Sequence, residues 1–165
     1  MTFLSQTKMI NKILNDINHE IKVRKTEFDD IKLDYLVIKL CGEFENNLNF
    51  IIENKLSINN NFSLNYINFI KSHDYKLHRG LQGDKFKKLL KDVFGKEHSE
   101  ILNKTEWQTF VAFINFRHAI AHSIKSYQQK KEDLITKMIS TENLINIVDK
   151  LLIQLNAISK FKKNN

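Results

Sequence analysis

The feature that most restricts the fold of this chain is the scarcity of residues that break helices. Its 165 residues include no Pro and only four Gly. Because Pro and Gly punctuate turns and interrupt helices, their scarcity favours long helices joined by short connections over a turn-rich β fold. Hydrophobic residues make up 42% of the chain and include twelve Phe, which is enough for one domain with a sizeable core.

Apolar residues recur at spacings of three and four along most of the chain, which is the pattern of helices that face a core. This pattern predicts an all-α fold, an up-and-down bundle of about five to six helices, with residues 1–165 as a single helical domain. The segments 72–83, 96–102 and 123–133 are predicted to be connections. The predicted helices cover residues 5–28, 32–56, about 61–71, 85–94, 105–124 and 141–161.

The charge and the cysteine count indicate a class of partner and a compartment. A net charge of +7, from 26 basic and 19 acidic residues, favours an anionic partner such as nucleic acid. The lone Cys41 excludes an internal disulfide and a cysteine-rich zinc site, and it suits a reducing cytosol. The N-terminus lacks the apolar run of a signal peptide, and no stretch has the length of a membrane span, so we expect a cytoplasmic protein.

Residues 105–124, TEWQTFVAFINFRHAIAHSI, are the most informative stretch. Thr105 is a candidate N-cap, and Gln108 stands three residues later, as in a capping box. Each residue turns a helix by about 100°, which puts Arg117 in the middle of the apolar stripe. An unpaired buried guanidinium costs many kcal/mol, so Arg117 is either paired or lines a cleft that an anion enters. A polar stripe runs beside it: Asn115, His118 and His122.

Residues 72–83 contain His73, Asp74 and His78, which could be considered as metal ligands. Zinc takes three or four ligands, and this spacing matches no common set. We therefore predict a solvated surface loop here and no metal site.

The hexapeptide RHAIAH, residues 117–122, at the end of an apolar helix in a basic all-α chain resembles the signature of the HEPN superfamily, an Arg followed by a polar residue and, after four to six positions, a His. The chain looks most like the RiboL-PSP-HEPN branch and related prokaryotic proteins. Upstream, KLCGEFENNLNFII is similar to the second helix of that branch, with Phe44-Glu45 as its aromatic and acidic pair. GDKFKKLLKDVFG is similar to the segment before the signature helix, so the resemblance spans about residues 33–124.

The resemblance implies a metal-independent endoribonuclease without a cofactor, the toxin or abortive-infection effector of a prokaryotic defence system. It also implies a homodimer whose two signature helices face one cleft, and an antitoxin or other defence partner. In HEPN toxins paired with a nucleotidyltransferase antitoxin, a Tyr that becomes modified stands two places after the signature His. Here that position is Ile124, and Tyr127 lies three residues further, which argues against that pairing.

The residue types suit RNA cleavage in which the 2′-OH attacks the neighbouring phosphorus and the 5′-oxygen leaves. His122 suits the proton transfer because an unperturbed imidazole has a pKa near 6.5. Arg117 suits the charge of the phosphorane because its planar fork matches phosphate oxygens. His118 can orient or share the proton, and Glu45 can hold Arg117 or polarise a histidine, with Asn115 in support. Candidate RNA contacts are Lys85, Lys88 and Lys125.

One geometric problem is apparent from the spacing. Residues five apart on an ideal helix point about 140° away from each other, so Arg117 and His122 of one chain converge poorly. Either the helix unwinds near residues 121–123, or a second copy of the chain supplies the missing group, and we expect a dimeric cleft with some distortion at the helix end.

Each candidate functional residue could instead have a purely structural role. Arg117 could be the buried partner of Glu43 or Glu45, and His122 a helix C-cap that interacts with the dipole. His118 could support rather than react, Glu45 could be an ordinary surface carboxylate, and the lysine-rich face of residues 85–94 could simply be solvated. The alternative function is a non-catalytic HEPN-like module that binds RNA or nucleotide or assembles with a partner. The aromatic residues favour the enzyme, because most lie on core stripes rather than between basic residues.

Overall fold

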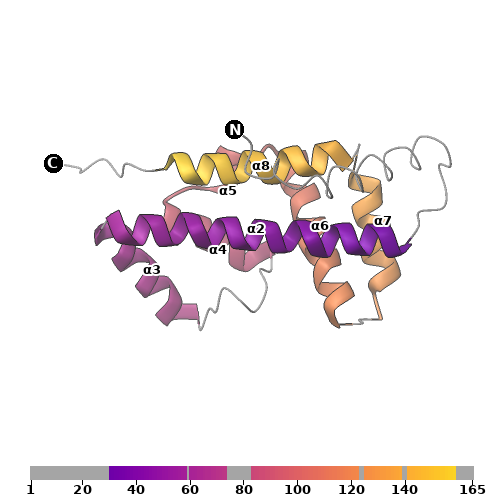
Figure 1. Cartoon of the computed structure of the whole chain (residues 1–165), viewed down its shortest axis with the longest axis horizontal. Helices are drawn as coiled ribbons and strands as arrows, with labels where there is room; N and C mark the ends of the chain where they lie inside the picture. Colours follow the sequence, from indigo (N-terminus) through magenta and orange to yellow (C-terminus); the bar gives the residue numbers. More distant parts are fainter. Residues whose placement is uncertain (1–29, 59, 74–82, 123–124, 139–140, 159–165) are drawn as a thin grey trace.

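Seven helices and no strand make up the described part of the chain, residues 30–58, 60–73, 83–122, 125–138 and 141–158 of a computed structural model (Figure 1). The prediction of an all-α helical bundle is confirmed, with two more helices in these residues than expected. The helix predicted over residues 5–28 lies outside them. The helices are α2 Asp30–Ile58, α3 Asn60–His73, α4 Gly83–Phe94, α5 His98–Ile101, α6 Lys104–His122, α7 Tyr127–Lys137 and α8 Thr141–Ala157.

Helix α2, with 29 residues the longest of them, forms the centre of the bundle, and α8 runs alongside it (Figure 1). Its apolar residues recur every three or four positions, so one face is buried along almost the whole helix. At the far end, Lys55 Nζ donates hydrogen bonds to the carbonyls of Asn156 and Ile158, at 3.2 and 2.8 Å, and so ties α2 to the end of α8. The buried apolar residues of α2 are Leu33, Leu36, Val37, Leu40, Cys41, Phe44, Leu48, Ile51 and Ile52.

A cluster of buried aromatic rings joins α2 to α4 and α6. The ring of Phe44 meets those of Phe86 and Phe110 edge to face, with centroids 5.7 and 5.4 Å away. Such pairs contribute about 0.5–1.5 kcal/mol beyond the area they bury. Phe44 therefore fixes where α6 crosses α2. Glu45 is the next residue in the sequence, so the same crossing also sets where its carboxylate lies relative to α6.

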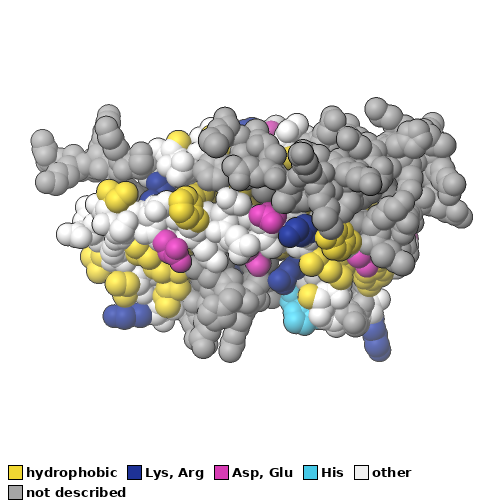
Figure 2. All heavy atoms as spheres, viewed as in Figure 1, with side chains coloured by type: hydrophobic (Ala, Val, Ile, Leu, Met, Phe, Trp, Pro, Cys, Tyr) yellow, Lys and Arg dark blue, Asp and Glu magenta, His cyan; other side chains and the backbone are white. Residues whose placement is uncertain are grey.

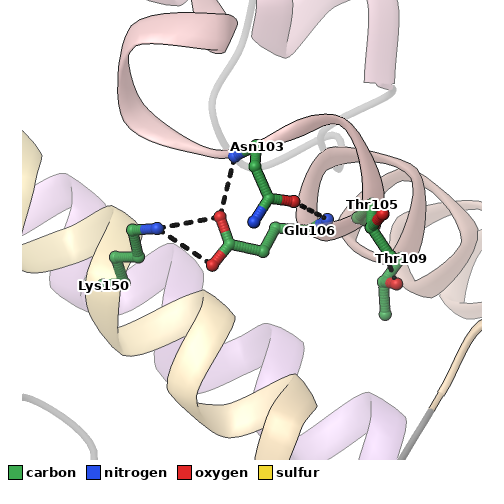
Figure 3. A network of polar contacts seen from close by, with 5 residues as sticks. All are labelled: Asn103, Thr105, Glu106, Thr109 and Lys150. Carbon is green, nitrogen blue, oxygen red and sulfur yellow. Dashed lines mark hydrogen bonds and ion pairs between the residues drawn. The ribbon is translucent and has the colours of Figure 1, made fainter.

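The first turn of α6 is capped by Asn103 rather than by Thr105, which lies inside the helix (Figure 3). Asn103 Oδ1 accepts a hydrogen bond from the backbone N–H of Glu106 at 2.9 Å, and Glu106 Oε2 accepts one from the N–H of Asn103 at 2.7 Å. This is a capping box two residues before the predicted one. Lys150 of α8 donates to both carboxylate oxygens of Glu106, at 2.9 and 2.8 Å, and so ties the start of α6 to α8.

Helix α7 forms where the sequence predicted a connection. Its polar sequence, YQQKKEDLITK, has little apolar periodicity of its own. It packs against a second buried face of α6. The ring of Phe116 on that face contacts the ring of Tyr127 on α7, with 5.3 Å between the ring centroids. This contact explains why α6 is apolar almost all round: α7 covers one side of it. The second buried face of α6 consists of Thr109, Ala112, Phe116 and Ala119.

The start of α7 is also held to α2 by a polar contact. The hydroxyl of Tyr127 donates to the carboxylate of Asp34, whose two oxygens lie 2.8 and 2.9 Å away. Burial and the nearby carboxylate raise the pKa of Tyr127 to about 12, so the hydroxyl keeps its proton at neutral pH. No described helix is both long enough and apolar enough to cross a membrane.

We predict that Tyr127→Phe destabilises the protein by about 1–2 kcal/mol, because it removes a hydrogen bond to a charged group that is only partly exposed. Thermal unfolding should show a Tm a few degrees lower. Tyr35→Phe is the matched control, since Tyr35 lies next to Asp34 on α2 and is exposed. Equal Tm values for the two variants would mean that the contact does not hold α7 in place.

Candidate functional site

Arg117 of α6 pairs with Glu45 of α2, with 3.9 Å between Nη2 of the guanidinium and Oε2 of the carboxylate. The Arg117 side chain is 26% exposed and that of Glu45 is 19% exposed. Glu43 instead pairs with Lys39 at 3.5 Å, so of the two candidate partners Glu45 is the one that holds Arg117. At 3.9 Å the pair is looser than a bidentate arginine–carboxylate contact, in which two guanidinium N–H groups donate to the two carboxylate oxygens.

A third side chain completes this contact. The thiol of Cys41, one turn before Glu45 on α2, donates to Glu45 Oε1 with 3.8 Å between sulfur and oxygen. Cys41 is 1% exposed, and burial together with the nearby Glu45 raises the pKa of its thiol to about 12. The spacing of four between Cys41 and Glu45 allows the two side chains to meet on one face of α2, and the structure shows that they do.

His118 and His122 lie one turn apart on α6, with their ring centroids 4.4 Å apart. His118 is partly buried and His122 is exposed. Burial, and then the charges of His122 and Arg117, lower the pKa of His118 below 6.5. His118 is therefore neutral at pH 7 and able to accept a proton, and the influence of Arg117 on it shows that the two histidines and the ion pair share one electrostatic environment.

The polar stripe of Asn115, His118 and His122 starts beside α4. On a helix these three residues and Val111 fall within about 60° of one another. A Cβ atom on Gly83, the first residue of α4, would lie 3.2 Å from Val111 Cγ1, so the two helices touch there. Figure 2 shows basic, acidic and histidine side chains grouped on the face where α2 and the end of α6 come together.

The three lysines predicted to contact RNA are all exposed. Lys85 lies two residues and Lys88 five residues after Gly83 on α4, so they leave that helix about 160° and 140° away from the side on which Gly83 meets Val111. Lys125 lies in the turn that leads from α6 to α7, beyond His122. Of the three lysines, Lys125 is therefore the one that lies near an end of the polar stripe.

Helix α6 keeps its α-helical form as far as His122. Arg117 and His122 therefore leave the helix about 140° apart, whereas His118, the next residue after Arg117, leaves it about 100° away. Unwinding does not bring Arg117 and His122 of one chain together within these residues. Ser123 and Ile124 lie outside the described residues.

The described residues contain no group of three or more His, Cys, Asp or Glu that could hold a metal ion. His73 is the last residue of α3, whereas Asp74 and His78 lie outside the described part of the chain.

No protein-family model, curated protein or solved structure significantly matches this chain. The interpretation of the site therefore rests on its own residues and their geometry.

We predict that His122→Asn raises the pKa of His118, because it removes one of the two positive charges that favour the neutral imidazole. The value should stay below 6.5, since burial is the larger cause. An NMR titration of the imidazole carbons between about pH 5 and 8 measures it. His98 is the internal control, because burial and Lys87 lower its pKa and it lies near the other end of α6. An unchanged pKa of His118 in the variant would contradict the prediction and mean that His122 has no electrostatic influence on His118.

Proposed function

We propose that this protein is a metal-independent endoribonuclease of the HEPN type, whose site is Arg117, Glu45, His118 and His122. The observation that carries the proposal is the partly exposed Arg117, loosely held by Glu45 beside a pair of histidines whose rings lie 4.4 Å apart. A guanidinium with free N–H groups can bind a phosphate, and an imidazole can move a proton near neutral pH. The net charge of +7 supports a polyanionic substrate.

In the proposed reaction His122 takes the proton of the RNA 2′-OH, and the oxygen attacks the adjacent phosphorus. Arg117 stabilises the negative charge that builds up on the phosphoryl oxygens. The bond to the 5′-oxygen breaks, that oxygen takes the proton from the protonated His122 and leaves as a 5′-hydroxyl, and the other product carries a 2′,3′-cyclic phosphate. His118 is neutral and close enough to His122 to orient it or to share the proton.

The RNA backbone follows the polar stripe of α6 in this proposal. Asn115 is one end of the stripe and His122 the other; the exposed Lys125 follows His122, and the exposed Lys85 and Lys88 lie on α4. These lysines contribute positive charge to phosphates on either side of the cleaved bond.

The proposed active form is a homodimer. The second apolar face of α6 does not require a second copy of the chain, since α7 covers it. Two other features support the dimer. Arg117 and His122 of one chain point about 140° apart. Helix α2, which carries Glu45, also exposes Tyr35, Ile38 and Phe50 by 40%, 50% and 56%, and a Cβ on its Gly42 would have no neighbour within 4 Å.

A defence role completes the proposal, with a cytoplasmic location, RNA as substrate and an antitoxin or other defence protein as a possible partner. This part rests on the resemblance of RHAIAH and the upstream segments to HEPN effectors. The alternative, a non-catalytic HEPN-like module that binds RNA or nucleotide or assembles with a partner, draws support from the same 140° separation, because one chain does not converge its own Arg and His.

We predict that the purified protein cleaves RNA in the presence of EDTA and leaves 2′,3′-cyclic phosphate and 5′-hydroxyl ends. His122→Ala should lower the rate by about 10²- to 10⁴-fold, as expected for a lost general base, with little change in Tm. Arg117→Ala should reduce cleavage as well. Mapping the ends on total RNA, together with a melting curve for each variant, measures both effects.

Lys104→Ala is the matched control for that assay, because it removes a positive charge from the opposite end of the same helix and should cleave like the unaltered protein. Lowered Tm with cleavage within a few-fold of wild type would make His122 a helix cap only. RNA binding without cleavage would favour the non-catalytic module, and activity that needs added Mg²⁺ would refute the metal-independent mechanism.

We predict that Ile38→Glu dissociates the dimer, because it places a charge in the exposed apolar face of α2. Sedimentation at micromolar concentration should give a dimer for the unaltered protein and a monomer for the variant, with cleavage lost in parallel. Ile153→Glu is the control, because Ile153 has a similar exposure, 41%, on α8. A monomeric wild type with full nuclease activity would contradict the proposal.

A further inference from the structure

Three side chains from two helices form a line from the core to the surface. The Cys41 thiol contacts Glu45 Oε1 at 3.8 Å, and Glu45 Oε2 contacts Arg117 Nη2 at 3.9 Å. Each oxygen of the one carboxylate thus has a different partner. The exposed fraction rises along the line, from 1% for Cys41 to 19% for Glu45 and 26% for Arg117.

We propose that Cys41 is a positioning residue that holds the carboxylate of Glu45 in the orientation in which only one oxygen faces Arg117. The inference deepens the proposed ribonuclease site and rests on it for the activity readouts below. Cys41 touches neither RNA nor the reacting atoms, and it acts through Glu45.

A carboxylate can meet a guanidinium in two ways, with both of its oxygens or with one. A carboxylate that is free to turn can present both oxygens, and the resulting bidentate pair occupies two guanidinium N–H groups. A phosphate needs those same N–H groups. A donor fixed on Oε1 keeps that oxygen turned toward Cys41, so that Arg117 is held in place and still has N–H groups to offer.

Cys41 suits this task because its thiol is buried and neutral. Water does not reach it to compete for the hydrogen bond, since the residue is 1% exposed. Its pKa of about 12 means that it keeps its proton and remains a donor. A thiol is a weak donor, so the expected effect of losing it is modest, about three- to tenfold in kcat/KM.

The test uses two substitutions at Cys41 and a double-mutant cycle. Cys41→Val fills the core without a donor, and Cys41→Ser restores a donor on a similar side chain. Both are made alone and with Glu45→Gln. Leu33→Val is the packing control, because Leu33 is fully buried on the same helix, about 18 Å from Glu45 along its axis.

Four quantities are measured for each variant. These are Tm, kcat/KM for RNA cleavage, Kd for a 2′-O-methyl RNA that cannot be cleaved, and the NMR order parameter of the Arg117 Nε–H group. The order parameter reports how firmly Glu45 holds Arg117 and does not depend on any activity.

The proposal expects Cys41→Val to lower kcat/KM and to weaken RNA binding about three- to tenfold, and to change the Arg117 order parameter. Cys41→Ser should recover most of both effects. In the Glu45→Gln background Cys41→Val should have no further effect, because Cys41 acts through Glu45.

Two results would overturn the proposal: a Cys41→Val variant that changes only Tm, as Leu33→Val does, or a loss that persists in full when Glu45 is already Gln. If the unaltered protein neither cleaves nor binds RNA, the proposed function fails, whereas the Arg117 order parameter still decides whether Cys41 positions Glu45.

Discussion

A guanidinium on the apolar side of a helix has to meet a negative charge, and this requirement links the two helices that define the site. Arg117 of α6 meets Glu45 of α2 at a distance of 3.9 Å. The contact is possible because Phe44, the residue before Glu45, packs against Phe86 and Phe110 and fixes where α6 crosses α2. The aromatic core thus sets the position of the ion pair, in which the Arg117 side chain stays 26% exposed.

Much of the fold could be predicted because the helices that bury one continuous face carry their own signal. The stripe of α2 from Leu33 to Ile52 is buried as the periodicity indicated. Helix α7 was missed because its stability comes from contacts with α6 and α2, namely Tyr127 on Phe116 and Asp34, rather than from its own polar sequence. The cap of α6 was misplaced by two residues, since Thr105 and Asn103 both have capping side chains and only the fold shows which one begins the helix.

The candidate site was predictable in its residue types but not in its partners. The wheel indicated that Arg117 is either paired or lines a cleft that an anion enters, and Glu45 was one of two carboxylates that could pair with it. Which of them does so depends on how α2 is rotated against α6, and a single helix contains no information on that rotation. The role of Cys41 was hidden for a related reason: an apolar position in a stripe looks the same whether or not its thiol meets a carboxylate at its edge.

The direction of each side chain around α6 limits how one chain could cleave RNA. His118 leaves the helix nearer to Arg117 than His122 does, and its lowered pKa favours the neutral ring at pH 7 but makes it a weaker base. His122 is exposed, and its ring lies 4.4 Å from that of His118. A proton taken up by one of these two rings is therefore close to the other ring. The histidine that accepts the proton need not be the one nearest to a phosphate held by Arg117. If a second copy supplies the base, its exposed His122 is the imidazole that can reach across an interface. If one chain acts alone, His118 is the histidine placed to act as the base, and His122 supports it. The two cases therefore exchange the roles of base and supporting ring between His118 and His122.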